Sequence, residues 1–108
     1  MFELVKVNEV LIIRVTRSLT IFDVDDINSP LPDLPKDVKG AILDLTSSEE
    51  IDSFGVSIIV RIMSFFKSLS KKFFVVAKEN KVMYILRIDK IDKIIPIYES
   101  IDEALKQF

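Results

Sequence analysis

A serine at the expected start of a long helix is the side chain of this sequence with the clearest potential for chemistry. It lies in the run Asp52-Ser53-Phe54-Gly55, which follows a short apolar segment that ends near Asp44. A hydroxyl in this position lies among free backbone N–H groups, at the positive end of the helix dipole. It could act as a nucleophile only if a neighbouring base removed its proton.

The composition limits which chemistry this serine could perform. The 108 residues contain no histidine and no cysteine, which removes the commonest general base and all thiol chemistry. An enzyme built on Asp52 and Ser53 is therefore the weakest hypothesis. A metal site formed by Asp44, Glu49, Glu50 and Asp52 is conceivable, but their spacing matches no established loop pattern. The composition favours binding over catalysis, and we expect no cofactor.

A plainer interpretation explains the same residues. Asp52 or Ser53 could be an ordinary helix N-cap, and Gly55 could be a glycine that allows close packing. Phe54 could either anchor a partner or pack beneath the helix. Spacing alone does not distinguish these alternatives.

The elements that must position this run follow from hydrophobic periodicity. Short segments rich in branched residues predict strands at 2–7, 10–16, 41–45, 73–77 and 94–97, with a hairpin turn at 8–9. Capping residues and a 3.6-residue period predict helices at 21–28, 53–69 and 80–87, and a last helix from 100. The order β-β-α-β-α-β-α-β-α predicts an α/β fold with a mixed, mostly parallel sheet in a single domain, 1–108. Function in such folds tends to lie at the carboxyl ends of the strands, where Asp44 and Ser53 are expected.

The charge is unevenly distributed along the chain. Residues 22–52 carry nine acids and two bases, a net charge of −7, whereas residues 53–93 carry a net charge of +6. The lysines are scattered without interleaved aromatic residues, so we expect no nucleic-acid partner. No apolar stretch approaches the roughly 20 residues of a membrane span, and no basic leader precedes an apolar block. We therefore expect a cytoplasmic protein with no membrane contact.

Several segments in order resemble one known family. Asp44-Leu45, then Ile51-Asp52-Ser53-Phe54-Gly55-Val56 and a long apolar helix, resemble the STAS domain of bacterial anti-sigma factor antagonists. The segments 82–86, 94–98 and 100–105 resemble the second helix, the closing strand and the last helix of that family. The resemblance implies a sheet with helices packed on one side, and a phosphoacceptor serine at Ser53. Phe54 stands where the family usually has a small hydroxyl residue, and the crossover at 21–35 is shorter than usual and broken by prolines.

The function that this resemblance implies is partner switching rather than catalysis. The unphosphorylated protein would bind an anti-sigma factor, itself a serine protein kinase, and phosphorylation of Ser53 would release it and so control transcription. The implied partner-binding residues are Asp44, Glu49, Glu50, Asp52, Ser53, Phe54, Gly55 and Ser57. The alternative is a STAS scaffold or accessory module without phospho-switching, in a stressosome-like, nucleotide-sensing or lipid-transport complex. A homodimer is left open.

Overall fold

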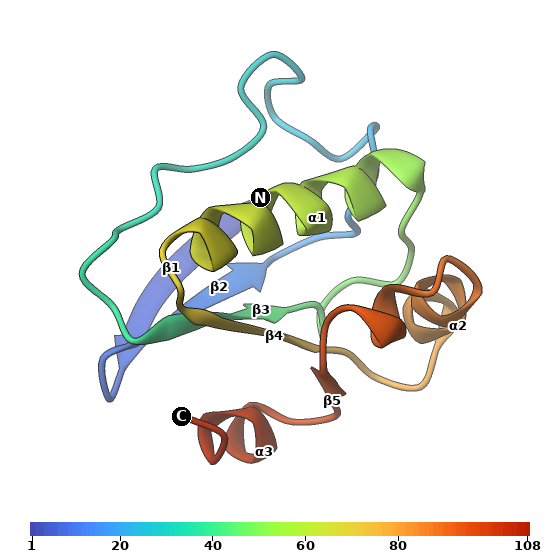
Figure 1. The fold of residues 1–108 in the computed structure, drawn as a ribbon. Coiled ribbons are helices and arrows are strands. Elements are labelled where there is room, and N and C mark those ends of the chain that lie inside the picture. Colours follow the sequence, from blue (N-terminus) through green and yellow to red (C-terminus); the bar gives the residue numbers. More distant parts are fainter.

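The computed structural model describes residues 1–108, which form a five-stranded sheet with three α-helices (Figure 1). The strands are β1 (Phe2–Val7), β2 (Val10–Val15), β3 (Gly40–Asp44), β4 (Lys72–Val76) and β5 (Ile97–Tyr98). The helices are α1 (Ser53–Ser68), α2 (Lys81–Ile88) and α3 (Ile101–Leu105), and a 3-10 turn η1 (Ile91–Lys93) follows α2. The strands lie side by side in chain order; β1 is antiparallel to β2, and every other pair is parallel. The predicted mixed, mostly parallel α/β sheet is therefore confirmed.

The hairpin that opens the sheet turns at the predicted dipeptide. Asn8 and Glu9 both have positive φ values, 50° and 67°, as a type I′ turn requires. This turn follows the right-handed twist of the strands that it joins, so two residues suffice to pair Val7 with Val10. The hairpin makes β1 an edge strand and places β2 next to β3.

Helix α1 confirms the prediction at 53–69 closely. Its buried side chains, among them Ile58, Ile62 and Phe66, face the sheet, whereas Ser57 and Arg61 belong to its exposed stripe. Asn80 caps α2 by accepting a hydrogen bond from Val82 N at 2.9 Å, again as predicted. No helix is both long enough and apolar enough to cross a membrane.

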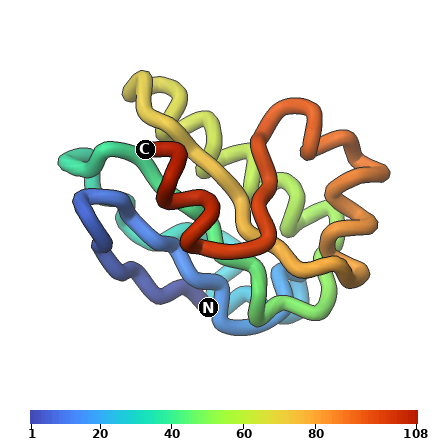
Figure 2. Tube along the Cα trace, turned by 90° about the horizontal axis from the view of Figure 1, so that it is seen from below, coloured from blue at the N-terminus to red at the C-terminus, as the bar shows by residue number.

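The helices cover both faces of the sheet, so the expectation that they pack on one side was wrong. Alternate residues of β2 divide between two core clusters: Leu11 and Ile13 pack in the cluster that α1 and α2 share, whereas Val10 and Ile12 pack in the cluster around Ala104 of α3. Figure 1 shows α1 above the sheet and α3 below it, and Figure 2, seen from below, shows the C-terminal helix lying across the strands. The chain can cover the second face because β2 and β3 are apolar on both sides.

The helix predicted at 21–28 does not form, and β2 connects to β3 through a long irregular loop. Thr20 closes only one turn, by accepting a hydrogen bond from Phe22 N at 3.2 Å on its hydroxyl, while its carbonyl accepts one from Asp23 N. The acids of this segment then bond elsewhere, as when Asp26 accepts a hydrogen bond from Asn28 N at 2.9 Å. Such local side-chain bonds compete with helical ones, and Pro30 and its successors end any continuation.

The last strand is shorter and later than predicted. The prediction covered 94–97, but β5 spans only Ile97–Tyr98 because Ile94 and Ile95 close the 3-10 turn by donating to Ile91 O. Pro96 lacks an N–H, so it cannot donate to a strand ladder. Ser100 caps α3 by accepting a hydrogen bond from the Glu103 N–H at 3.1 Å on its hydroxyl oxygen.

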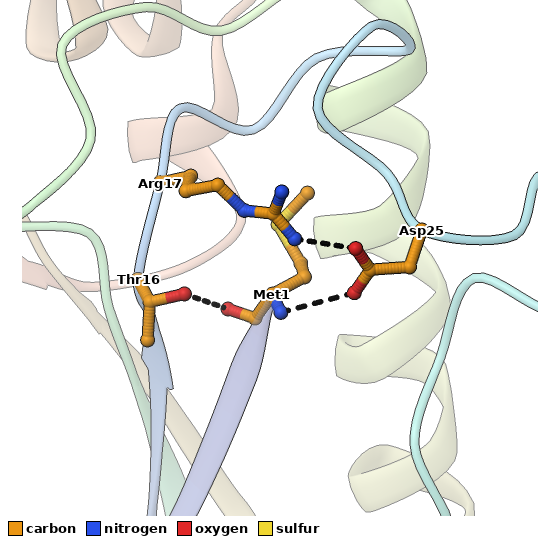
Figure 3. A network of polar contacts seen from close by, with 4 residues as sticks. All are labelled: Met1, Thr16, Arg17 and Asp25. Carbon is orange, nitrogen blue, oxygen red and sulfur yellow. Dashed lines mark hydrogen bonds and ion pairs between the residues drawn. The ribbon is translucent and has the colours of Figure 1, made fainter.

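Three segments that are distant in sequence meet at Asp25. In Figure 3 its carboxylate lies between the guanidinium of Arg17 and the amino group of Met1, and the Met1 carbonyl accepts a hydrogen bond from Thr16 Oγ1. The hydrogen bond from Arg17, and then the one from the Met1 amino group, lower the pKa of Asp25 below its ordinary value. These contacts tie the loop after β2 to the start of β1.

The lowered pKa predicts how acid affects stability. A carboxyl group whose pKa is lowered in the folded state adds stability above its unfolded pKa of about 3.9, and this contribution disappears as the pH falls through the lowered folded value. We expect Asp25→Asn to be less stable than the parent chain at pH 6 and to approach it below about pH 3. Urea unfolding at a series of pH values measures this difference. A gap that stayed constant with pH would contradict the assignment.

Candidate functional site

The loop between β3 and α1 is held rigidly against the segment that follows β2. Ser48, which is buried, donates its hydroxyl to Arg17 O at 2.6 Å. Ser18 Oγ accepts hydrogen bonds from Glu49 N and Glu50 N, and Leu19 forms a parallel bridge with Ile51. The backbone of this loop is therefore anchored at several consecutive residues.

Asp52 is the N-cap of α1 and also holds the neighbouring loop. Its Oδ1 accepts a hydrogen bond from Gly55 N at 2.9 Å, which caps the helix, and its Oδ2 accepts one from Ile21 N at 3.0 Å. Both carboxylate oxygens are thus engaged by backbone N–H groups. This arrangement suits a positioning role and leaves Asp52 poorly placed to serve as a general base.

Gly55 is required by packing and not by its backbone conformation. A Cβ built at this position would lie 2.0 Å from the carbonyl oxygen of Leu19 and 2.7 Å from Cγ1 of Ile51. The helix can start this close to the backbone of Leu19 only because residue 55 has no side chain. The plainer interpretation, a capping Asp52 and a packing Gly55, thus describes what these two residues do in the structure.

Ser53 is the first residue of α1, and its side chain is exposed. It lies between the cap and the packing glycine, so its position is fixed from both sides. A negative group at this end of a helix interacts favourably with the helix dipole, by about 0.3–1 kcal/mol. The arrangement presents a hydroxyl at a defined place on the surface, where a separate enzyme could reach it.

The other residues of the predicted partner surface divide into exposed and buried groups. Glu49, Glu50 and Ser57 are exposed, and Ser57 lies one turn after Ser53 on the same helix. Phe54 is half-buried and packs against the main core, so it is neither a free anchor nor fully internal. The structure therefore brings an exposed set together around the start of α1.

Asp44 is separated from this exposed set by burial. Its carboxylate, 4% exposed, accepts hydrogen bonds from Arg14 Nε at 3.4 Å and from Thr46 N at 2.9 Å. It holds the turn after β3 and presents no surface to a partner. Gly55 is likewise buried beneath Leu19.

The carboxylates of this region do not gather into a metal centre. No three acidic side chains lie in an arrangement that could hold an ion. Asp44 and Asp52 use their oxygens to hold backbone N–H groups, whereas Glu50 lies 3.7 Å from the amino group of Lys81. The donor set at this site fits protein contacts better than ion binding.

A cleft of about 550 Å³ lies beside the start of α1 and includes residues that no sequence motif connects. The turn after β2 lines it with Thr20 and Phe22, the loop before α1 with Asp52, and α2 with Lys81 and Tyr84. The only sequence signal for this cleft was an aromatic residue, Phe22, in an acidic segment interrupted by prolines. No local sequence pattern indicates that α2 lies next to that turn in the folded chain.

The chain therefore forms a mixed, mostly parallel α/β sheet with an exposed serine, Ser53, at the start of its longest helix. The protein-family model described as "STAS domain" matches residues 1–104 of this chain. The chain belongs to the STAS domain family.

Relatives and solved structures agree with this assignment. A Thermotoga neapolitana protein described as a "Putative anti-sigma factor antagonist" homologue is 35% identical over 74 residues, which are 68% of this chain and 66% of that protein. A Thermotoga maritima protein with the same description is 34% identical over the same shares of the two chains. The crystal structure of a Thermotoga maritima protein with that description matches with a TM-score of 0.80 at 27% identity, covering 98% of this chain and 92% of that one. These relatives carry the names of regulatory proteins and not of enzymes.

Proposed function

We propose that this chain is an anti-sigma factor antagonist that works by partner switching. In its unphosphorylated form it binds an anti-sigma factor that is also a serine kinase, and phosphorylation of Ser53 ends the binding. The observation that carries the proposal is the exposed Ser53 at the first position of α1, held between the capping Asp52 and the packing Gly55. Family membership and the names of the relatives support it.

The contact surface in this proposal is smaller than the residue set that the family resemblance implies. Glu49, Glu50, Ser53, Ser57 and the accessible part of Phe54 contact the partner, because these side chains reach the surface. The remaining three residues, Asp44, Asp52 and Gly55, hold this surface in shape. Because the loop before α1 is already ordered by hydrogen bonds, association would cost little loop-ordering entropy.

The switching step is an ordinary phosphoryl transfer in which the partner supplies the catalyst. The bond between the γ-phosphorus of ATP and its bridging oxygen breaks, a new bond forms to Ser53 Oγ, and ADP leaves with that bridging oxygen. The hydroxyl proton passes to a base of the kinase, since this chain has no histidine and Asp52 is engaged in hydrogen bonds. The product carries a charge of about −1.5 to −2 at an interface that was formed by a neutral hydroxyl.

Phosphate analysis of the purified chain tests this proposal. Incubation with ATP and the serine-kinase-type anti-sigma factor from the same genome should add one phosphate, which mass spectrometry should locate at Ser53. Ser53→Ala should remain unlabelled, whereas Ser64→Ala, which removes an exposed hydroxyl farther along α1, should be labelled like the parent chain. Phosphate at another residue would contradict the assignment of Ser53.

A second candidate is a STAS scaffold that binds its partner without being phosphorylated. Phe54, half-buried beside the acceptor serine, favours this alternative because a bulky ring could restrict the approach of a kinase. In that case the anti-sigma factor would bind the chain without labelling it. Association with transporter subunits and with no anti-sigma factor would instead indicate an accessory module.

A further inference from the structure

The cleft beside α1 has two aromatic side chains at its edge that the fold itself does not use. Phe22 is 93% exposed and Tyr84 is 63% exposed, although both line the cleft. Aromatic side chains left in water at the edge of a concave site are typical of interface hot spots. Their exposure leaves both rings free to contact another molecule.

The turn that presents Phe22 is held in shape by partly buried and exposed hydrogen bonds. Thr20, which is 8% exposed, donates its hydroxyl to Asp23 Oδ2 at 2.6 Å and accepts a hydrogen bond from Phe22 N. The Ile21 N–H is held by Asp52 Oδ2, so the turn is also tied to the cap of α1. The backbone at Phe22 is therefore anchored by hydrogen bonds while its ring remains exposed.

The charges around the cleft select the kind of side chain that it could receive. Three carboxylates line it (Asp23, Glu50 and Asp52) and only one amino group, that of Lys81. Lys81 is paired with Glu50 at 3.7 Å, with 79% and 64% of the two side chains exposed. A pair this exposed is held weakly, so a better-matched cation could displace Lys81 from Glu50. The cleft thus combines excess negative charge with exposed aromatic rings.

We infer that this cleft binds an arginine side chain of the partner protein. A guanidinium group can pair with a carboxylate through two parallel hydrogen bonds while its flat face stacks on an aromatic ring, which an ammonium group cannot do. Glu50 and the remaining carboxylate oxygen of Asp23 supply the acceptors, and Phe22 and Tyr84 supply the rings.

This inference rests on the proposed function, because it requires the partner that binds around Ser53 to present an arginine side chain. Ser53 itself does not line the cleft, whereas its neighbour Asp52 does. A phosphate on Ser53 would therefore offer the guanidinium a competing position outside the cleft. Movement of the arginine to that position would disturb the docked arrangement of the partner.

An NMR titration with matched peptides tests the cleft without any anti-sigma factor. The probes are capped Gly-Arg-Gly and its citrulline counterpart, which has nearly the same shape but no charge. The arginine peptide should shift the amides of Phe22, Ile51 and Tyr84 saturably at millimolar concentrations, and the citrulline peptide should not. Tyr84→Ala or Glu50→Gln should weaken this binding about two- to fivefold, as the loss of one exposed cation–aromatic or charge contact would.

Glu103→Gln is the matched control, because it removes an exposed carboxylate from α3, on the opposite face of the sheet. It should leave the titration unchanged. Equal shifts with the two peptides, shifts elsewhere on the chain or no saturable shift would overturn the inference.

Binding of the full anti-sigma factor separates this inference from the proposed function. An affinity that is unchanged by Tyr84→Ala and by Glu50→Gln would overturn the arginine site while leaving the proposed function intact. Saturable binding of the arginine peptide in the cleft, with no anti-sigma factor bound, would support the site and count against the proposed function.

Discussion

Replacement of Ser53 by aspartate should weaken binding of the anti-sigma factor by at least about tenfold, equivalent to about 1.4 kcal/mol or more. The physical reason is that an interface formed around a neutral hydroxyl would have to bury a carboxylate without a dedicated partner. The fold should tolerate the change, because Ser53 is exposed and a negative charge in the first turn interacts well with the helix dipole. We expect the free energy of unfolding to stay within about 1 kcal/mol of the parent value. Isothermal titration calorimetry and urea unfolding measure the two quantities.

Two variants distinguish charge at this position from other effects of the substitution. Ser53→Asn matches the size of aspartate without its charge, so it should retain more affinity than Ser53→Asp. Ser64→Asp adds the same charge to an exposed position of the same helix, 11 residues later and so about 16 Å along its axis. It should bind the partner nearly as well as the parent chain. Unchanged affinity for Ser53→Asp would count against control by phosphorylation.

Replacement of Gly55 by alanine should destabilise the fold by about 1–3 kcal/mol or more, which is the usual range for overpacking. Glycine-to-alanine changes inside helices ordinarily stabilise, by about 0.4–1 kcal/mol, so the expected sign is reversed here. The reversal follows from the added methyl group, which would lie 2.0 Å from the carbonyl oxygen of Leu19. That oxygen belongs to the backbone of a bridged segment and cannot move alone. Thermal and urea unfolding measure the loss.

Ser64→Ala is the matched control for Gly55→Ala, because it improves helix propensity at an exposed site of α1 without introducing a clash. It should leave stability unchanged or slightly raised. A Gly55→Ala variant as stable as this control would mean that α1 can shift away from Leu19 at no cost. The close approach would then not be what requires glycine at position 55.

The run 52–55 contains residues with a structural role and an exposed serine, and the sequence alone does not distinguish these roles. Asp52 and Gly55 are structural: one caps the helix and holds Ile21, and the other lets the helix approach Leu19. Ser53 is left as the exposed residue between them. Substitution of either structural residue should therefore affect partner binding indirectly, through the position of Ser53, together with a loss of stability.

Much of the fold could be predicted because the local signals agreed with the tertiary packing. The apolar runs of β2, β3 and β4, the period of α1 and the caps at Asp52, Asn80 and Ser100 all correspond to observed elements. The helix predicted at 21–28 does not form because acidic side chains of that segment bond to groups outside a helix, as Asp25 does with Arg17. Propensity and capping signals do not show where such partners lie in space.

The sequence by itself determined most of the strands and helices, the capped start of α1 with its serine, and the exclusion of histidine and cysteine chemistry, because these depend on residue identity and on contacts between near neighbours. Only the tertiary structure decided which residues of the candidate site reach the surface. It buried Asp44 under the turn after β3, closed Gly55 against Leu19, placed α3 on the second face of the sheet and formed the cleft from Phe22 and Tyr84. The physical reason is that burial and cleft shape depend on the approach of segments 30 or more residues apart, which the local pattern of a sequence does not specify.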